Sequence, residues 1–281
     1  MNVVTGMHRS GTSFICQVLN SLGADFGESE KLFRADKFNA KGYYENIDFV
    51  DVNNKMVLGL GTDFANWQKE SNSKPLIRMF RNIISGKFKY LFQPSLNKIN
   101  SRADSLSEKM DLLGQEYFDL WVKDPRFCLT LRSWRKFTSV NKVVFCFRNP
   151  SGVAFSLKKR EHLPLSVGYS FWNYHTLNFF RELPPGTKVL LVNFDYFFHE
   201  QHQEEAFRRI GRFVGLDEDD KRIAELPSIL DIRLWNKQKA LPDMPAKSEA
   251  AYKALLSLYS NSESATMFDE GLREFSLLRE L

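Results

Sequence analysis

Residues 2–23 read NVVTGMHRSGTSFICQVLNSLG, and this stretch decides the fold of the chain. Residues 2–5 are short and β-branched, which favours a buried strand. Apolar residues at helical spacing follow further on, closed by a glycine that is typical of a helix end: Phe14, Ile15, Val18, Leu19, Leu22 and Gly23. The loop between the two elements contains Gly6 and Gly11. Strand, glycine loop and helix together bring backbone N–H groups and a helix N-terminus to one point, which favours a bound phosphate.

The loop has the glycine spacing of a nucleotide-binding P-loop but lacks its lysine. From Gly6 to Ser13 the pattern is G-x-x-x-x-G-T-S, against G-x-x-x-x-G-K-[ST] in P-loop ATPases and kinases. Thr12 stands where those enzymes carry the lysine that contacts the transferred phosphate. The cation of this loop is Arg9, three residues earlier. The pattern therefore predicts a phosphate site whose geometry at the reacting phosphate differs from that of P-loop ATPases and kinases. A plain strand–turn–helix corner with two glycines is the structural alternative.

The same loop resembles a more specific one. Arg9, Ser10, Gly11, Thr12 and Ser13 match, position by position, the pattern [KR]-[SG]-G-T-[ST]. This is the 5′-phosphosulfate-binding loop of sulfotransferases that use 3′-phosphoadenosine 5′-phosphosulfate (PAPS). The resemblance implies that these five residues bind the cosubstrate and that the fold is the P-loop-like sulfotransferase fold.

Composition and charge place the chain among soluble globular proteins. It has 281 residues, of which 43% are hydrophobic and 26% charged, with a net charge of +5. That charge fits an anionic ligand but does not indicate nucleic acid, because no basic run with interleaved aromatic residues is present. Cys16, Cys128 and Cys146 stand in apolar surroundings, which predicts buried free thiols. Without a signal peptide or an 18-residue apolar run, we expect a cytoplasmic protein with no transmembrane segment.

Strands alternate with helices along the rest of the chain. A strand that runs into a loop is predicted over residues 121–126, and further apolar, buried strands are predicted at residues 143–147 and 188–193. Helices are predicted near residues 75–85, 105–117, 151–160, 166–182, 203–214, 249–259 and 267–278, with Ser151 as an N-cap and Gly215 as a helix end. This order predicts an α/β fold with a doubly wound parallel sheet and flanking helices. Ligands then bind at the carboxyl ends of the strands, where the loops from Gly6, Lys123 and Arg148 meet.

We expect one domain over residues 1–281. Residues 55–119 are weakly patterned and are interpreted as a helical insertion that covers the site, and residues 216–281 as a helical C-terminal part. The heavy aromatic face of residues 166–182 is interpreted as core.

Residues 143–160, VVFCFRNPSGVAFSLKKR, contain a second candidate phosphate site. Arg148 ends a strand, and Ser156 lies eight residues later on the following helix. A planar guanidinium can hold a phosphate through two hydrogen bonds, and a hydroxyl adds a third. The segment resembles the 3′-phosphate-binding element of the sulfotransferase family. A surface arginine and a helical serine are the structural alternatives, but two phosphate-binding elements suit a nucleotide phosphorylated at both ends.

Sulfuryl transfer needs a base for the acceptor hydroxyl and positive charge at the leaving group. Glu45, in the segment Gly-Tyr-Tyr-Glu, resembles the presumed general base of bacterial and carbohydrate sulfotransferases. His8 is the alternative base, or else a positioning or packed histidine. Arg9 is expected to stabilise charge on the leaving phosphate. Lys123 begins a segment that resembles the family's K-D-P-R, in which it assists Arg9 or holds the acceptor.

The other two charges of that segment, Asp124 and Arg126, are expected to brace the loop by pairing with each other. The Arg-Lys-Gly element and the downstream histidine base of the cytosolic small-molecule branch are not recognisable here. The sequence therefore predicts a PAPS-dependent sulfotransferase of the carbohydrate-type, bacterial branch, which releases adenosine 3′,5′-bisphosphate and needs no metal. Its acceptor is expected to be a hydroxyl on a glycan or glycolipid. A P-loop nucleotide or small-molecule kinase and a non-catalytic nucleotide-binding module remain the alternatives.

Overall fold

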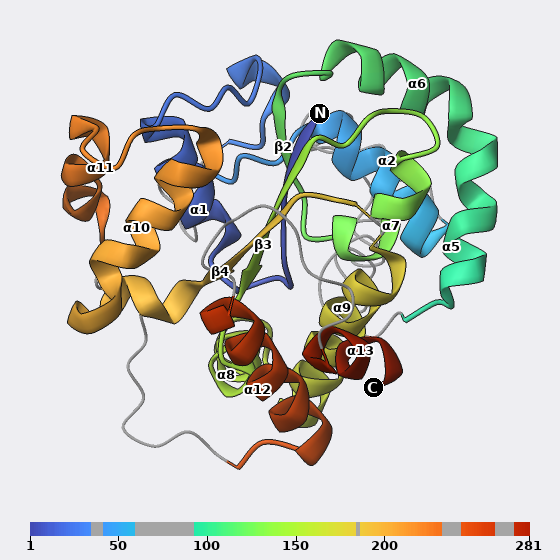
Figure 1. The fold of residues 1–281 in the computed structure, drawn as a ribbon. Coiled ribbons are helices and arrows are strands. Elements are labelled where there is room, and N and C mark those ends of the chain that lie inside the picture. The colour runs from blue at the N-terminus through green and yellow to red at the C-terminus, as the bar shows by residue number, and fades with distance from the viewer. Residues whose placement is uncertain (35–41, 60–92, 184–185, 232–242, 262–272) are drawn as a thin grey trace.

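A four-stranded parallel sheet forms the centre of the chain (Figure 1). The computed structural model describes residues 1–34, 42–59, 93–183, 186–231, 243–261 and 273–281. The strands are β1 (Asn2–Thr5), β2 (Trp121–Lys123), β3 (Lys142–Phe147) and β4 (Val189–Asn193), in the spatial order β2-β1-β3-β4. Asn2 at the start of β1 pairs with both Trp121 and Lys142. The chain therefore winds outward from β1 in both directions, which confirms the predicted doubly wound α/β fold.

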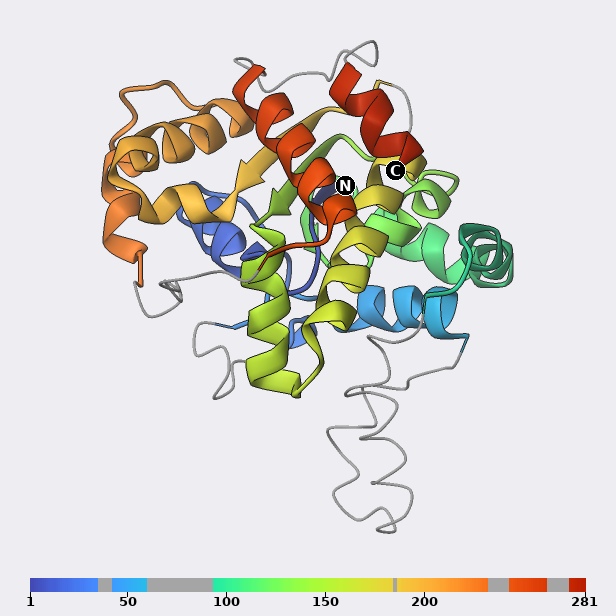
Figure 2. The ribbon, with the colours of Figure 1, turned by 90° about the horizontal axis from the view of Figure 1, so that it is seen from below.

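Helices cover both faces of this sheet (Figures 1 and 2). On one face lie α1 (Thr12–Ser21), α10 (Glu200–Val214) and α11 (Lys221–Glu225). The other face carries α2 (Ile47–Leu58), α5 (Leu96–Ala103), α6 (Ser107–Glu116), α7 (Phe127–Trp134), α8 (Pro150–Glu161), α9 (Leu165–Glu182), α12 (Ala246–Asn261) and α13 (Arg273–Glu280). Short 3₁₀ segments follow α5, β4 and α11 at Asp104–Leu106, Phe194–Phe198 and Leu226–Ile229, and one lies at Ser29–Lys31.

The strands are apolar on both sides because both faces are covered. Along β3, Val143, Phe145 and Phe147 belong to one hydrophobic cluster, whereas Val144 and Cys146 belong to the other. This is the period-two alternation of side chains in a strand. The aromatic side chains of α9 pack into the first cluster, as expected, with the Phe179 ring stacked 4.2 Å from that of Phe145. All three cysteines are buried and free, which confirms that prediction.

Two details of the sequence interpretation change. Asn149, not Ser151, is the N-cap of α8: its side chain accepts from the Ser151 backbone N–H at 2.9 Å. Pro150 then occupies the first helical turn, where its missing N–H costs nothing. The predicted helix at residues 75–85 lies outside the described residues, as does the first part of the one at 267–278. In the described part of residues 55–119, the helices α5 and α6 follow each other. None of the described helices is long and apolar enough to span a membrane.

Candidate functional site

Three residues of the loop after β1 have positive φ angles. Gly6, Arg9 and Gly11 have positive φ angles of 143°, 71° and 90°. Gly11 is the N-cap of α1 and provides no side-chain cap, so the first N–H groups of the helix depend on other acceptors. The Ser10 hydroxyl is fully buried and has no hydrogen-bond partner among the described residues. A buried unsatisfied hydroxyl beside uncapped helix N–H groups fits a bound phosphate or phosphosulfate.

A hydrogen bond joins this loop to the second candidate phosphate element. Nε of Arg9 donates to Oγ of Ser156 on α8 at 3.0 Å. These two residues are 147 positions apart in the chain, but β1 and β3 are neighbours in the sheet, so the loops that follow them meet. The structure therefore places the two segments that the sequence proposed at one edge of the sheet.

Arg148, which directly follows β3, is held by the 3₁₀ segment that follows β4. Its Nε lies 3.2 Å from Oδ1 of Asp195, and the other carboxylate oxygen accepts from the Asn149 N–H at 3.0 Å. The guanidinium also stands over the ring of Phe194, 5.1 Å from its centroid, in cation–π geometry. Arg148 is 5% exposed, so this cation is fixed in orientation before any ligand arrives.

Sequence reasoning missed Asp195 and Phe194. A signal for both exists, because they follow the buried strand β4 directly and so lie at the same carboxyl edge as the other loops. Phe194 also contacts the phosphate loop. A Cβ atom on Gly11 would lie 2.0 Å from Cδ2 of the Phe194 ring, so only glycine fits there.

We expect Gly11→Ala to distort this loop. The variant combines a left-handed backbone with steric overlap on a buried ring, and we expect unfolding free energy to fall by about 2–4 kcal/mol. Gly215→Ala is the matched control, because Gly215 has a φ of 95° but nothing within 4 Å of the added Cβ. It isolates the backbone cost of roughly 1–2 kcal/mol. Equal losses in the two variants, measured by urea denaturation, would show that the contact with Phe194 has no effect.

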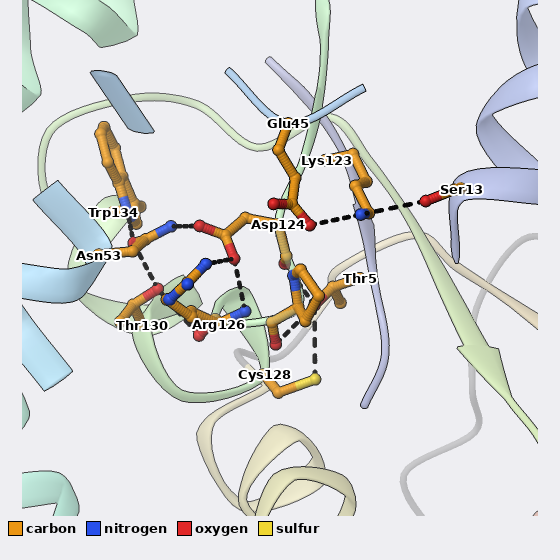
Figure 3. Close-up of polar contacts among 11 residues, drawn as sticks. Thr5, Ser13, Glu45, Asn53, Lys123, Asp124, Arg126, Cys128, Thr130 and Trp134 are labelled. Atoms are coloured by element: carbon orange, nitrogen blue, oxygen red, sulfur yellow. Dashed lines mark hydrogen bonds and ion pairs between the residues drawn. The ribbon is translucent and has the colours of Figure 1, made fainter. Parts of the chain in front are cut away.

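Lys123 and Glu45 form a buried ion pair beside α1 (Figure 3). Nζ of Lys123 lies 2.5 Å from Oε1 of Glu45 and 3.4 Å from Oγ of Ser13, in the first turn of α1. The Lys123 side chain is 3% exposed and that of Glu45 is 17% exposed. Glu45 precedes Asn46, the N-cap of α2, whose side chain accepts from Asp48 N at 2.9 Å and so fixes where the helix starts. The contact with Lys123 fixes the orientation of the Glu45 carboxylate beside the first turn of α1.

Asp124 and Arg126 pair with each other, as the sequence predicted, and the pair is part of a larger buried network (Figure 3). Oδ1 of Asp124 accepts from N and Nη1 of Arg126 at 2.9 and 2.8 Å. Oδ2 accepts from Nδ2 of Asn53 on α2 at 2.9 Å. The Asn53 amide oxygen accepts from Thr130 and Trp134 on α7, both at 2.8 Å. Asn53 was not anticipated, and it ties α2, which follows Glu45, to the segment that carries Lys123.

His8, within the loop, lies near the rings of Phe171 and His175 on α9. Its ring centroid is 6.4 Å from that of Phe171 and 5.9 Å from that of His175, and the three residues line one small cavity. His175 is 2% exposed, and its Nδ1–H donates to the Phe171 carbonyl at 3.1 Å. Burial lowers the pKa of His175 to about 3, although the bond to Phe171 opposes the shift.

The lowered pKa of His175 predicts acid sensitivity. In the unfolded chain the imidazole titrates near 6.5, so between pH 6.5 and 3 the unfolded state binds a proton that the folded state does not. Stability should therefore decrease as the pH falls through this window. In His175→Phe we expect a smaller loss of melting temperature between pH 7 and pH 5 than in the wild type. Parallel losses in the two proteins would contradict this assignment.

The candidate residues thus gather at the carboxyl ends of β1, β2 and β3. No model of a known protein family matches the chain, and no curated protein matches it significantly. Among solved structures it is similar to the sulfotransferase domain from the Synechococcus PCC 7002 olefin synthase, with 14% identity and a TM-score of 0.42 over all of this chain and 93% of that one. It is also similar to the sulfotransferase domain from the curacin biosynthetic pathway, with 12% identity and a TM-score of 0.40 over 100% and 96% of the two chains. Both are sulfotransferase domains.

Proposed function

We propose that the protein is a sulfotransferase that transfers a sulfuryl group from PAPS to an acceptor hydroxyl. The observation that carries the proposal is the hydrogen bond between Arg9 and Ser156. It joins two segments that each resemble a phosphate-binding element of this family, at the edge of the sheet where such folds bind nucleotides. The buried pair of Lys123 and Glu45 beside α1 adds a base and a cation.

PAPS supplies the activated sulfuryl group when it is bound. The backbone from Ser10 to Ser13 and the Arg9 guanidinium are proposed to hold its 5′-phosphosulfate. Arg148 and Ser156 are proposed to hold its 3′-phosphate. The buried Ser10 hydroxyl and the uncapped start of α1 fit the first role, and the fixed guanidinium of Arg148 fits the second.

Glu45 is proposed to take the proton of the acceptor hydroxyl. The hydroxyl oxygen then bonds to sulfur as the bond between sulfur and the 5′-phosphate oxygen breaks, and adenosine 3′,5′-bisphosphate leaves. Lys123 orients Glu45 through their ion pair, and Arg9 stabilises the negative charge that develops on the leaving phosphate. His8, which packs against Phe171, is proposed to position this loop.

The first test is calorimetric titration with adenosine 3′,5′-bisphosphate, with ADP and magnesium as comparator. We expect the bisphosphate to bind more tightly and without metal. In Arg148→Gln its affinity should fall about 10- to 100-fold, because a charge-assisted hydrogen bond contributes about 1.5–3 kcal/mol. Tighter binding of ADP with magnesium would overturn the proposal in favour of a P-loop kinase, in spite of Thr12. Bisphosphate binding without transfer to any acceptor would favour the non-catalytic nucleotide-binding module.

The finer expectations from the sequence are also part of this proposal: one domain, a glycan or glycolipid hydroxyl as acceptor, catalysis without metal and a cytoplasmic location. An acceptor screen with radiolabelled PAPS tests the acceptor class directly. Transfer to phenols or steroids in preference to sugars would contradict the carbohydrate-type assignment.

A further inference from the structure

A second cationic surface lies at the opposite edge of the sheet from the candidate site. A groove of about 580 Å³ there is lined by Arg132, Arg135, Lys136, Arg181, Glu182, Leu183 and Arg279. These residues come from the ends of α7 and α9 and from α13. The lining residues on α7 and just after it precede β3, those of α9 precede β4, and Arg279 on α13 packs on Leu183. The phosphate loop and Arg148, in contrast, follow the carboxyl ends of β1 and β3. We call this feature the cationic groove.

Few carboxylates neutralise the cationic groove. Its lining has five cations and one carboxylate, Glu182. Glu182 is 8% exposed and accepts from Arg132 at 3.4 Å and from Asn100 at 3.2 Å. Lys136 pairs with Asp104 at 3.3 Å, in a contact where both side chains are more than half exposed. Among the described residues, no other carboxylate pairs with these five cations. The groove therefore keeps a local excess of positive charge.

Besides Arg132, which donates to Glu182, the other three guanidinium groups of the groove also donate to protein acceptors. Arg279 donates through Nε and Nη2 to the carbonyl oxygens of Phe180 and Leu183, both at 3.2 Å. Arg181 donates through Nε to the Arg279 carbonyl at 3.1 Å. Arg279 has a structural role, because its two hydrogen bonds satisfy carbonyl groups at the end of α9. This role does not account for the presence of the other four cations in the groove.

Arg135 is anchored in a similar way, because its Nη1 donates to Oγ1 of Thr187 at 2.6 Å. Among the described residues, no acceptor is bonded to Nη2 of Arg135, Nη2 of Arg181 or Nη1 of Arg279. Each group thus has spare N–H donors on an already oriented plane. Oriented guanidinium groups suit phosphate and sulfate, which accept two parallel hydrogen bonds.

We propose that the cationic groove is a second anion site, which binds a small molecule carrying two or more phosphate or sulfate groups. The volume of the groove is in the range of small-molecule sites. An anion with a single negative charge would neutralise only part of the positive charge of its five cations. The site is independent of the sulfuryl-transfer site, so it stands or fails separately from the proposed function.

The test is calorimetric titration with inorganic tripolyphosphate as the phosphate probe and sucrose octasulfate as the sulfate probe. Saturating adenosine 3′,5′-bisphosphate is added to occupy the candidate nucleotide site, and Arg148→Gln serves as a second way to weaken binding at that site. We expect Arg135→Gln/Arg181→Gln to lower the affinity for the preferred probe at least tenfold. Arg208→Gln is the matched control, because this exposed arginine on α10 pairs with Glu204 outside the groove. It should change the affinity less than twofold.

Lys136→Gln provides a second variant if the double variant does not fold, since this side chain is 51% exposed. It should lower the affinity about threefold or more. The preferred probe distinguishes a phosphorylated from a sulfated ligand. The proposal is overturned if neither probe binds the wild type, if the groove variants bind as the wild type does, or if Arg148→Gln abolishes the binding.

Discussion

Replacing Glu45 by glutamine is expected to lower turnover with PAPS by about 10²- to 10⁴-fold, the range for a general base. The amide keeps the size and one hydrogen-bond acceptor of the side chain, so the contact with Lys123 at 2.5 Å can partly persist. What is lost is the group that accepts the proton. Affinity for adenosine 3′,5′-bisphosphate should change little, because Glu45 is proposed to act on the acceptor. Steady-state kinetics and calorimetry on the same preparation measure both quantities.

A second glutamate–lysine pair offers the control. Glu116 lies 2.6 Å from Lys31, almost the same distance, but on the surface. Glu116→Gln removes the same charge without touching the site and should leave turnover unchanged. If Glu45→Gln retains full activity, the base is another residue, and His8 is the first to examine. If both variants lose activity equally, the effect is one of stability rather than of chemistry.

Removal of the Asp124 carboxylate is expected to have the largest effect on stability. Asp124 is completely buried and accepts three hydrogen bonds, two from Arg126 and one from Asn53. In Asp124→Ala the Arg126 guanidinium, which is 11% exposed, loses its buried counter-charge. Breaking a buried pair in this way costs about 3–5 kcal/mol. Urea denaturation should show this loss in the free energy of unfolding.

The chain contains the same motif at its surface. Asp220 accepts from N and Nε of Arg222, two residues on, at 2.9 and 3.0 Å. Hydrogen bonds from Arg222 lower the pKa of Asp220 to about 2. Asp220→Ala should nevertheless destabilise the protein far less than Asp124→Ala, because water replaces the lost partner. Similar losses in the two variants would mean that burial of Asp124 is not the decisive factor.

The sequence was informative where periodicity and chain order decide the structure. The strand at residues 2–5 was predicted with the bounds that the structure has, and the predicted strand that runs into a loop over residues 121–126 is observed at Trp121–Lys123. Short segments with β-branched residues leave few alternatives in an alternating α/β order. The N-cap at Asn149 was missed because asparagine and serine both suit that position, and only the turn geometry selects one.

The site was predictable only where a segment resembles a known motif. Arg9 and Ser156 were both identified, but their direct hydrogen bond follows from the packing of two loops, which no spacing rule contains. Asn53 lies in the middle of α2, where an asparagine is usually exposed and uninformative. Its role depends on Asp124 lying 71 residues further on. Long-range pairs of this kind become visible only in three dimensions.

The strand order also constrains how this protein folds. Among the described strands, β1 is synthesised before the other three, yet it is central and pairs with residues 121–123 on one side and 142–145 on the other. A growing chain therefore cannot complete these pairings until residues 142–145 have left the ribosome. Such non-local contacts slow folding and leave an apolar strand exposed in the meantime. During this period residues 2–5 are a natural target for chaperones, before they become an interior strand of the sheet.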